Sequence, residues 1–255
     1  MHCQKYIIFA SDYTPSVKKI KLLTVSFDTE IRDYEIPAFR GAVVAKVGRE
    51  NILFHNHLND NKLLYRYPLI QYKTIGKKPV IQCIDLGVDE IHKFFQKSNW
   101  NLTISDRMLD MEIYRLDLNQ YTMQVWDKTF DYSIRNWIAL NKQNYETYLA
   151  LENSGQKVRL LEKILTANIL AFAKGIEWRV DKPITVKIKT LSEIRDLSLK
   201  RRTVLGFKVL FTANVFIPNY IGLGKSVSLG FGIVTRNENI ADQHVEPHAV
   251  VNYEL

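Results

Sequence analysis

The sequence predicts an α+β protein built from two tandem ferredoxin-like domains. In the first half of the chain, strand-like and helix-like patterns follow one another in the order β-α-β-β-α-β, which is the order of a ferredoxin-like domain. In the second half, a long helical pattern is followed by several strand-like runs. With 255 residues, the chain is long enough for two small domains, each with a core of its own.

The period of the apolar residues divides the first half into elements. Residues 19–27 alternate between apolar and polar side chains, which indicates a strand, and the apolar residues of 36–47 recur at helical spacing. Two β-rich runs joined by Ile75-Gly76-Lys77-Lys78 predict a hairpin. The expected elements are a strand at 19–27, a helix at 36–47, hairpin strands at 68–74 and 79–84, a helix at 88–95 with Asp85 as its N-cap, and a strand at 100–104.

The second half carries the longest helical pattern, over residues 158–172, which ends near Gly175. The strands expected around it are 112–118 and 121–126 before the helix, and 176–180, 184–188, 205–217 and 228–234 after it. We place the domain boundary at Ser105-Asp106-Arg107, which gives an N-terminal domain at 1–106 and a C-terminal domain at 107–236.

The chain is basic, with a formal net charge of +8 at pH 7. Residues 237–255 form an acidic tail with four Asp or Glu side chains and no Lys or Arg, so the rest of the chain carries +12. We expect the tail to be a disordered end. We expect the basic body to bind a polyanion, because each neutralised phosphate releases counterions. Charge alone does not separate RNA from DNA or from a membrane surface.

No targeting or membrane segment is expected. The chain has no run of about eighteen apolar residues, and the apolar stretch at 6–10 is too short for a signal peptide. Cys3 and Cys83 have neither metal-ligand spacing nor a disulfide framework. We therefore expect a cytoplasmic, reduced protein that binds no membrane.

Residues 220–232 concentrate glycine: they hold four of the eleven glycines of the chain, with Lys225 and two serines among them. Glycine lets the backbone approach a ligand, and a lysine with hydroxyl groups suits phosphate oxygens. The spacing differs from a Walker A loop, since Asn219 stands where glycine is needed, and from a dinucleotide fingerprint, since Val227 stands at its third glycine. The segment is either a phosphate-binding loop of another kind or a glycine-rich hairpin turn.

His55 and His57 are two of the six histidines and stand two residues apart after a strand-like stretch at 52–54. In an extended chain, residues i and i+2 project from the same face, about 7 Å apart. Two imidazoles can supply one base and one acid at neutral pH, as metal-free RNA cleavage requires. The residues alone leave three interpretations open: a catalytic pair, a metal site, and solvated or core histidines.

Two further groups of side chains are suited to RNA. Tyr65, Arg66 and Tyr67 combine rings that can stack on bases with a guanidinium that can hold a phosphate, although they also read as the entry to a half-buried strand. In the second half, basic residues are interleaved with aromatic ones, and a solvated charged face is the alternative there. The basic members are Lys187, Lys189, Lys200, Arg201, Arg202 and Lys208.

The C-terminal half also resembles a family signature. A strand that ends in Phe-Thr-Ala-Asn-Val-Phe-Ile-Pro at 211–218 is followed by Ile-Gly-Leu-Gly-Lys and by Ser-Leu-Gly-Phe-Gly-Ile-Val. This stretch resembles the closing glycine-rich loop of CRISPR-associated RNA-binding proteins of the RAMP type. Among them it is similar to the repeat-cleaving endoribonucleases, the family called CRISPR-associated protein six. Further similar stretches are Phe-Arg-Gly-Ala at 39–42, Leu-Phe-His-Asn-His at 53–57, and the stretches at 65–73 and 140–145.

The resemblance covers most of residues 20–236, and it implies two RRM-like domains and an endoribonuclease that uses no metal and no cofactor. Such an enzyme would cleave CRISPR precursor RNA within its repeats by attack of a 2′-hydroxyl, leaving a 2′,3′-cyclic phosphate and a 5′-hydroxyl. His55, His57 and Tyr65 would be catalytic. The residues expected to bind RNA are Arg40, Arg66, Tyr67, Lys187, Lys189, Lys200, Arg201, Arg202, Lys208, Gly222, Gly224, Lys225 and Ser226.

The partner that the resemblance implies is repeat RNA in the precursor of CRISPR RNA. A CRISPR effector complex and a second copy of the chain are further candidates. The alternative function is a non-catalytic RNA-binding RAMP subunit of an effector complex, since one fold can serve both functions.

Overall fold

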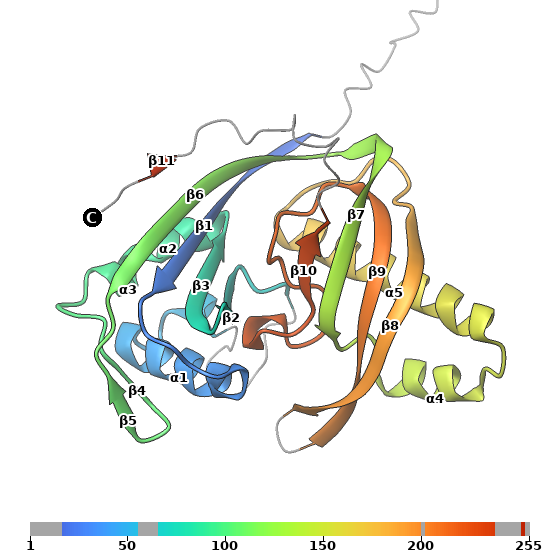
Figure 1. Cartoon of the computed structure of the whole chain (residues 1–255). Coiled ribbons are helices and arrows are strands. Elements are labelled where there is room, and N and C mark those ends of the chain that lie inside the picture. The colour runs from blue at the N-terminus through green and yellow to red at the C-terminus, as the bar shows by residue number, and fades with distance from the viewer. Residues whose placement is uncertain (1–16, 56–65, 200–201, 238–250, 253–255) are drawn as a thin grey trace, which may run out of the picture.

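The computed structural model describes residues 17–55, 66–199 and 202–237 and the backbone of 251–252. Two β-sheets lie side by side, and helices cover one face of each (Figure 1). The first half comprises β1 (Lys18–Phe27), η1 (Asp33–Glu35), α1 (Ile36–Val47), η2 (Ile52–Phe54), β2 (Ile70–Ile75), β3 (Lys78–Ile84), α2 (Leu86–Glu90), α3 (His92–Phe95), β4 (Leu102–Ile104), β5 (Arg107–Leu109) and β6 (Ile113–Met123). The second half comprises β7 (Val125–Trp137), α4 (Lys142–Ala150), α5 (Ser154–Gly175), β8 (Val186–Leu199), β9 (Arg202–Val215), η4 (Val227–Leu229) and β10 (Ile233–Arg236), and β11 (Val251–Asn252) follows.

The first sheet has the strand order β11-β6-β1-β3-β2, and each neighbouring pair is antiparallel. β1 alternates as predicted: Leu23, Val25 and Phe27 belong to the core under α1. Its intervening residues Thr24 and Ser26 lie on the other face of the sheet. The strand, the helix and the hairpin predicted for residues 19–84 are confirmed.

The strand expected at 100–104 forms as β4, but it does not close the first sheet, and that part of the prediction is wrong. β4 pairs with β5 in a separate two-stranded sheet, across a turn in which Ser105 and Asp106 have φ of 47° and 66°. Positive φ at both central residues makes a tight hairpin that turns the chain back on itself. β6 takes the place beside β1 instead, and the chain crosses to the second sheet at Gln124, downstream of the boundary expected at 105–107.

The second half repeats this topology with one helix fewer in residues 125–199 and 202–237. Its strand order β10-β7-β9-β8 corresponds to β6-β1-β3-β2 of the first sheet, and all its pairs are antiparallel. α5 fills the first helical connection, as predicted, whereas the second connection is the glycine-rich stretch with the short turn η4. Two tandem ferredoxin-like units, as predicted from the sequence, are therefore confirmed.

Residues 176–180, expected to be a strand, instead form the cap of α5. The Trp178 amide donates to the carbonyl oxygen of Ala173 at 2.8 Å. Glu177 has φ of 56°, the left-handed geometry of a helix C-cap. Ile176 and Trp178 are buried because the cap turns both into the core of the second half. The alternation that suggested a strand therefore reflects a helix cap.

Asparagine side chains start the two helices of the second half. Asn153 accepts hydrogen bonds from first-turn amides of α5, and Asn141 does so for α4, a helix that the sequence analysis did not predict. Asp85 makes no such bond at the start of α2, and its carboxylate pairs with Lys18 at 3.2 Å. Asp85 therefore stands at the expected N-cap position without making a side-chain capping bond, and the helix expected at 88–95 is divided into α2 and α3.

The two halves share a core. One cluster of buried side chains lies between the first sheet and α1. A second, larger cluster fills the second half and extends to Ile20, Leu22 and Ile84 of the first sheet. Because both halves bury side chains in this cluster, packing alone opposes their separation.

Candidate functional site

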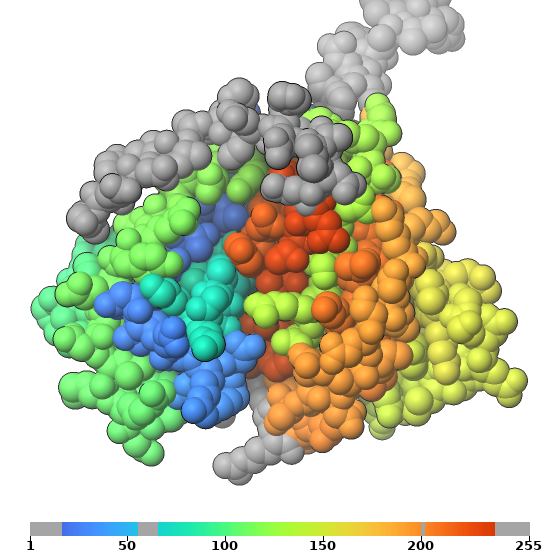
Figure 2. Space-filling model, in the orientation of Figure 1, coloured from blue at the N-terminus to red at the C-terminus, as the bar shows by residue number. Residues whose placement is uncertain are grey.

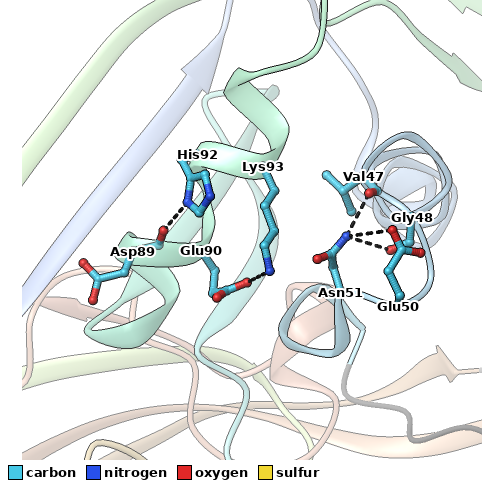
Figure 3. Close-up of polar contacts among 8 residues, drawn as sticks. All are labelled: Val47, Gly48, Glu50, Asn51, Asp89, Glu90, His92 and Lys93. Atoms are coloured by element: carbon cyan, nitrogen blue, oxygen red, sulfur yellow. Dashed lines mark hydrogen bonds and ion pairs between the residues drawn. The ribbon is translucent and has the colours of Figure 1, made fainter.

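The C-terminus of α1 sets the place of His55. Asn51 Nδ2 donates to the carbonyl oxygens of Val47 (2.8 Å) and Gly48 (3.4 Å), and so closes the last turn of the helix (Figure 3). Gly48 has φ of 103°, which lets the chain leave the helix. The chain then makes the short turn η2 and reaches His55.

Residues 52–54 form a 3₁₀ turn, and the extended segment expected there is wrong. Phe54 is 1% exposed and packs into the core under α1, which draws the turn inward. His55 follows with φ of −137° and ψ of −6°, outside the strand region. His57 lies outside the described residues, so the expectation that both imidazoles share one face stays a prediction.

His55 is held through its backbone and through its ring. A guanidinium nitrogen of Arg40 on α1 donates to the His55 carbonyl oxygen. His55 Nε2 lies 2.7 Å from the carbonyl oxygen of Arg49, which can only accept, so this nitrogen carries a proton. The Tyr72 hydroxyl donates to the neighbouring Phe54 carbonyl oxygen at 3.1 Å. The half-buried imidazole is therefore attached to a turn that α1 and β2 anchor together.

Tyr67, expected to contact RNA, lies between the two halves. Its hydroxyl donates to the Gly222 carbonyl oxygen at 2.7 Å and accepts from Gln71 Nε2 at 2.8 Å. Its ring packs against Phe172 of α5 with the centroids 5.2 Å apart, and burial raises the pKa of the phenol well above its ordinary value. These contacts give Tyr67 a role in joining the halves, and an RNA contact by its ring stays a prediction.

The first two glycines of the glycine-rich segment approach atoms of the chain itself. A Cβ at Gly222 would lie 2.6 Å from Val227 Cβ, and a Cβ at Gly224 would lie 2.8 Å from the Trp137 ring. Gly224 has φ of 97°, so both its conformation and its surroundings require glycine. Figure 2 shows this segment and β10 in red as a strip between the first half and the orange strands β8 and β9.

Lys225 and Ser226 form the outward part of the glycine-rich segment. The Lys225 side chain is exposed, and its backbone amide donates to the carbonyl oxygen of Ile138 at 3.2 Å. Ser226 has φ of 56°, a left-handed conformation at the start of η4. The ammonium and hydroxyl expected to meet RNA are thus presented by a fixed turn, and the RNA contact itself stays a prediction.

The end of the glycine-rich segment reaches the elements that hold His55. A Cβ at Gly230 would lie 2.7 Å from Ile36 Cδ1 of α1 and 3.3 Å from the Tyr72 carbonyl oxygen of β2. η4 also contacts both α1 and β2. The structure therefore brings the glycine-rich segment and the His55 turn, which are far apart in the sequence, to the same strand and helix.

A buried lysine that the sequence analysis did not single out lies at this junction. Lys73 is 0% exposed, and its Nζ donates to side-chain oxygens of Gln71 (3.0 Å) and Gln82 (2.6 Å). It also donates to the carbonyl oxygen of Tyr220. Burial and the nearby Arg135 lower the pKa of Lys73 to about 7. The signal in the sequence was the alternation of polar Gln71 and Lys73 with Ile70 and Tyr72, which puts the two polar side chains on one face of the strand.

Two of the basic residues expected to bind RNA are engaged in ion pairs. Lys187 pairs with Glu162 of α5 at 3.6 Å, and Lys189 pairs with Asp131 of β7. Both lysines are exposed on β8, where a carboxylate partly neutralises each of them. Each carboxylate partly offsets the positive charge that a phosphate would meet at these lysines.

Arg202 and Lys208 are exposed on β9, and neither has a carboxylate at ion-pair distance within the ranges that the structure describes. Lys208 lines a surface pocket of about 250 Å³ formed by β7, β8, β9 and η1. The other residues of this pocket are Asp33, Arg135, Asn136, Glu193, Arg195 and Phe207. Lys208 thus shares this pocket with two arginines and with the carboxylates of Asp33 and Glu193, and its contact with RNA stays a prediction.

His57, Tyr65, Lys200 and Arg201 lie outside the described residues. Arg66 is exposed at the start of the second described range. Of the expected site, the structure thus gathers Arg40, His55 and Tyr67 around β2, and it sets Lys187, Lys189, Arg202 and Lys208 apart on β8 and β9.

The histidine on α3 is engaged within its own helical region. His92 Nδ1 lies 2.5 Å from the Asp89 carbonyl oxygen, and Lys93 pairs with Glu90 at 2.5 Å (Figure 3). In the parts of the chain with described positions, no three His, Cys, Asp or Glu side chains are grouped so as to hold a metal ion. None of the described helices is both long and apolar enough to cross a membrane.

Two family models match the chain, one after the other. The model of the Cas6b N-terminal domain matches residues 18–122, and that of the Cas6b C-terminal domain matches residues 124–237. The chain belongs to the Cas6b family. The two Cas6b matches meet where β6 ends and the chain crosses between the sheets. The resemblance to CRISPR-associated protein six that the sequence shows is thereby confirmed.

Three individual proteins are similar to this chain. A crystal structure of a Cas6b protein is 28% identical, superposes with a TM-score of 0.77, and covers 86% of this chain and 100% of its own. A crystal structure of a CRISPR RNA processing endoribonuclease Cas6b shares the fold at 23% identity, with a TM-score of 0.64 and the same coverage of 86% and 100%. An uncharacterized protein of Methanocaldococcus jannaschii is 39% identical over 147 residues, which are 54% of this chain and 96% of that protein.

Proposed function

We propose that this chain is a metal-independent endoribonuclease that cleaves CRISPR precursor RNA within its repeats and so produces guide RNA. The observation that carries the proposal is that both Cas6b domains are present in order, with His55 on a turn held by α1 and β2. A solved protein of this fold is a CRISPR RNA processing endoribonuclease, and we extend that activity to this chain. Repeat RNA is accordingly its proposed partner.

His55 and His57 act as the acid–base pair of the proposed reaction. One imidazole removes the proton from the 2′-hydroxyl, which attacks the adjacent phosphate. The other gives a proton to the departing 5′-oxygen, so the products are a 2′,3′-cyclic phosphate and a 5′-hydroxyl. Imidazole can serve in either role near neutral pH, and such proton transfer typically contributes about 10²–10⁴-fold. Tyr65 belongs to the same proposed site.

RNA is held mainly by basic side chains in this proposal. Arg66, Lys225, Arg202 and Lys208 are exposed, and each can neutralise a phosphate. Imidazoles near neutral pH add little net charge, so removing them should affect cleavage more than binding. Substitution of the histidines should therefore separate RNA cleavage from RNA binding.

Single-turnover cleavage of repeat RNA tests this function. We expect His55→Ala and His57→Ala each to slow cleavage by about 10²-fold or more, with Kd changed by less than about tenfold. The double variant should be little slower than the slower single one, because the pair acts as a unit. His92→Ala is the matched control, since His92 is exposed on α3 and should leave both quantities unchanged.

The same assay identifies the alternatives. Activity should persist in excess EDTA, and the upstream product should carry a cyclic phosphate. Loss of activity on chelation, restored by a divalent ion, would make the histidines metal ligands. Tight binding of repeat RNA without any cleavage by the unaltered chain would instead identify a non-catalytic RAMP subunit.

A further inference from the structure

β2 presents alternate side chains to two different partners. Gln71 and Lys73 bind the glycine-rich segment, at the Gly222 amide and the Tyr220 carbonyl oxygen. Tyr72, between them, is fully buried in the first core and donates its hydroxyl hydrogen bond to Phe54 of η2. Its ring packs edge-on against Phe39 of α1 with the centroids 5.7 Å apart. Burial raises the pKa of Tyr72, so its hydroxyl remains a donor throughout the neutral range.

Arg40 reaches the next carbonyl from α1. Its guanidinium donates to the His55 carbonyl oxygen, and its Nε is buried without a hydrogen-bond partner among the described residues. Burying part of a guanidinium against a backbone carbonyl, with one nitrogen left unsatisfied, is costly for folding. The arrangement is therefore better explained if Arg40 positions His55 than if Arg40 stabilises the fold.

We propose that Tyr72 and Arg40 are positioning residues for the acid–base chemistry, because they hold the two consecutive carbonyl groups of Phe54 and His55. This inference rests on the proposed function of His55. A strand and a helix fix the turn from different sides, so His55 and the chain that leaves it toward His57 start from a defined point. A misplacement of about 1 Å can cost about 10²-fold in rate, which is enough for two backbone hydrogen bonds to matter.

Tyr72→Phe tests the strand side of this arrangement. The substitution keeps the buried ring and removes the hydroxyl alone. We expect single-turnover cleavage to slow by about 10-fold or more at saturating RNA, with Kd unchanged within about twofold. Ile169→Val is the matched control, since it removes one methyl group from a fully buried residue of α5 in the other half. At comparable losses in Tm, the control should cleave at the unaltered rate.

A double-mutant cycle shows whether Tyr72 acts through His55. Tyr72→Phe should have no further effect on the residual rate in a His55→Ala background, because the group that it positions is already absent. Equal effects in both backgrounds would overturn the positioning role. If His55→Ala itself cleaves at the full rate, the proposed catalytic role of His55 fails, and that failure is visible without any Tyr72 variant.

Hydrogen exchange provides a readout that does not need activity. The His55 amide donates to the Ile52 carbonyl oxygen at 3.1 Å, and the Phe54 amide donates to Asn51 at 3.1 Å. Tyr72→Phe should speed exchange at both amides about 10-fold or more, whereas Ile169→Val should not. Faster exchange with an unchanged cleavage rate would overturn the inference, as would unchanged exchange. Faster exchange in a chain that never cleaves RNA would overturn the proposed function and leave the anchoring of the turn intact.

Arg40→Met tests the helix side and separates positioning from phosphate binding. If Arg40 is a positioning residue, Arg40→Met should lower the cleavage rate and leave both Kd and its salt dependence unchanged. If Kd weakens and the slope of log K against log salt flattens by about 0.7–0.9, Arg40 contacts a phosphate and its positioning role is overturned.

Discussion

The Tyr67 hydroxyl donates a hydrogen bond to the Gly222 carbonyl oxygen at 2.7 Å, although 155 positions separate the two residues. Gln71 extends this contact, because its Nε2 donates to the same hydroxyl at 2.8 Å and its Oε1 accepts from the Gly222 amide at 3.1 Å. Side chains of the first half thus bind both backbone groups of Gly222. These bonds attach the glycine-rich segment to the entry of β2, and they help to fix how the two halves sit together.

Removing the Tyr67 hydroxyl should weaken this joint without weakening RNA binding. Tyr67→Phe leaves the Gly222 carbonyl oxygen and one Gln71 donor without their partner, so we expect the free energy of unfolding to fall by about 1–2 kcal/mol. The aromatic ring, which is the part suited to stack on a base, remains. Urea unfolding and RNA titration measure the two quantities.

Tyr145→Phe is the control for this prediction, since Tyr145 is 43% exposed on α4. It should change neither quantity. An unchanged unfolding free energy together with weaker RNA binding in Tyr67→Phe would show that the hydroxyl contacts RNA and that the joint does not depend on it.

Lys73 should make stability depend on pH. Burial, with repulsion from Arg135, lowers its pKa from the ordinary 10.5 of a lysine to about 7. Between these values the unfolded chain holds a proton on Lys73 that the folded chain has lost. The free energy of unfolding therefore rises with pH from about 7 to about 10, by at most about 1.4 kcal/mol per pH unit. Below pH 7 both states are protonated and the group contributes no slope.

Lys73→Met should remove this rise. We expect the unfolding free energy of the unaltered chain minus that of Lys73→Met to grow between pH 7 and pH 9.5 in urea titrations, because other groups cancel in the difference. Lys19→Met, at an exposed position of β1, serves as the matched control. A constant difference across this range would mean that Lys73 keeps its ordinary pKa despite its burial.

The sequence predicted the elements whose apolar period is long and undisturbed. α1 and α5 have buried residues at helical spacing, and the strands of the β2–β3 hairpin are continuous runs that are buried on both faces of the sheet. The failures lie where a short apolar alternation has another cause. Ile176 and Trp178 alternate because they flank a left-handed cap residue, and β4 pairs with β5 because a tight turn intervenes. The spacing of apolar residues along one strand does not predict which other strand will pair with it in the sheet.

The sequence identified the residue types of the candidate site better than their contacts. His55 and the glycine-rich segment were singled out, but their meeting at β2 depends on hydrogen bonds between residues far apart in the chain. Phe54 is apolar in either an extended or a turned segment, so the 3₁₀ turn before His55 left no periodic signal. Tyr72 and Lys73 belong to the stretch at 65–73 that resembles the family. Their contacts differ because they project from opposite faces of β2: Tyr72 contacts Phe54 in the first core, and Lys73 contacts Tyr220 of the glycine-rich segment.

The glycines differ in how much their positions require glycine. A Cβ at Gly232 would lie 1.8 Å from the Leu223 carbonyl oxygen, and Gly232 has φ of 63°, so Gly232→Ala should lower the unfolding free energy by about 2 kcal/mol or more. Gly41 in α1 has no atom within 4 Å of an added Cβ. Gly41→Ala should raise stability by about 0.5–1 kcal/mol, because alanine favours the helix. Thermal unfolding of the two variants checks the sign of each change in stability. A Gly232→Ala variant as stable as the unaltered chain would contradict the close packing of Gly232 against Leu223 in the glycine-rich segment.

Salt dependence should distinguish basic residues that bind RNA from those that bind carboxylates. Log K for repeat RNA falls with log salt by about 0.7–0.9 for each phosphate contact. Arg202→Ala and Lys208→Ala should each flatten this slope by that amount, because neither residue has a carboxylate partner among the described residues. Lys187→Ala and Lys189→Ala should flatten it by less than half as much, because Glu162 and Asp131 already neutralise these lysines.

The same measurement tests Lys200 and Arg201, which connect β8 to β9. Alanine at Lys200, Arg201 and Arg202 together should flatten the slope by more than Arg202→Ala alone if these residues contact the RNA backbone, with at most about 0.9 added for each further contact. The comparison is made at constant pH over a series of salt concentrations, so that the slope and not a single Kd is compared. Equal slopes for Arg202→Ala and the triple variant would exclude Lys200 and Arg201 from the RNA surface. A change in slope for Lys187→Ala as large as that for Lys208→Ala would show that Lys187 contacts a phosphate despite its pairing with Glu162, and would extend the binding surface along β8 toward α5.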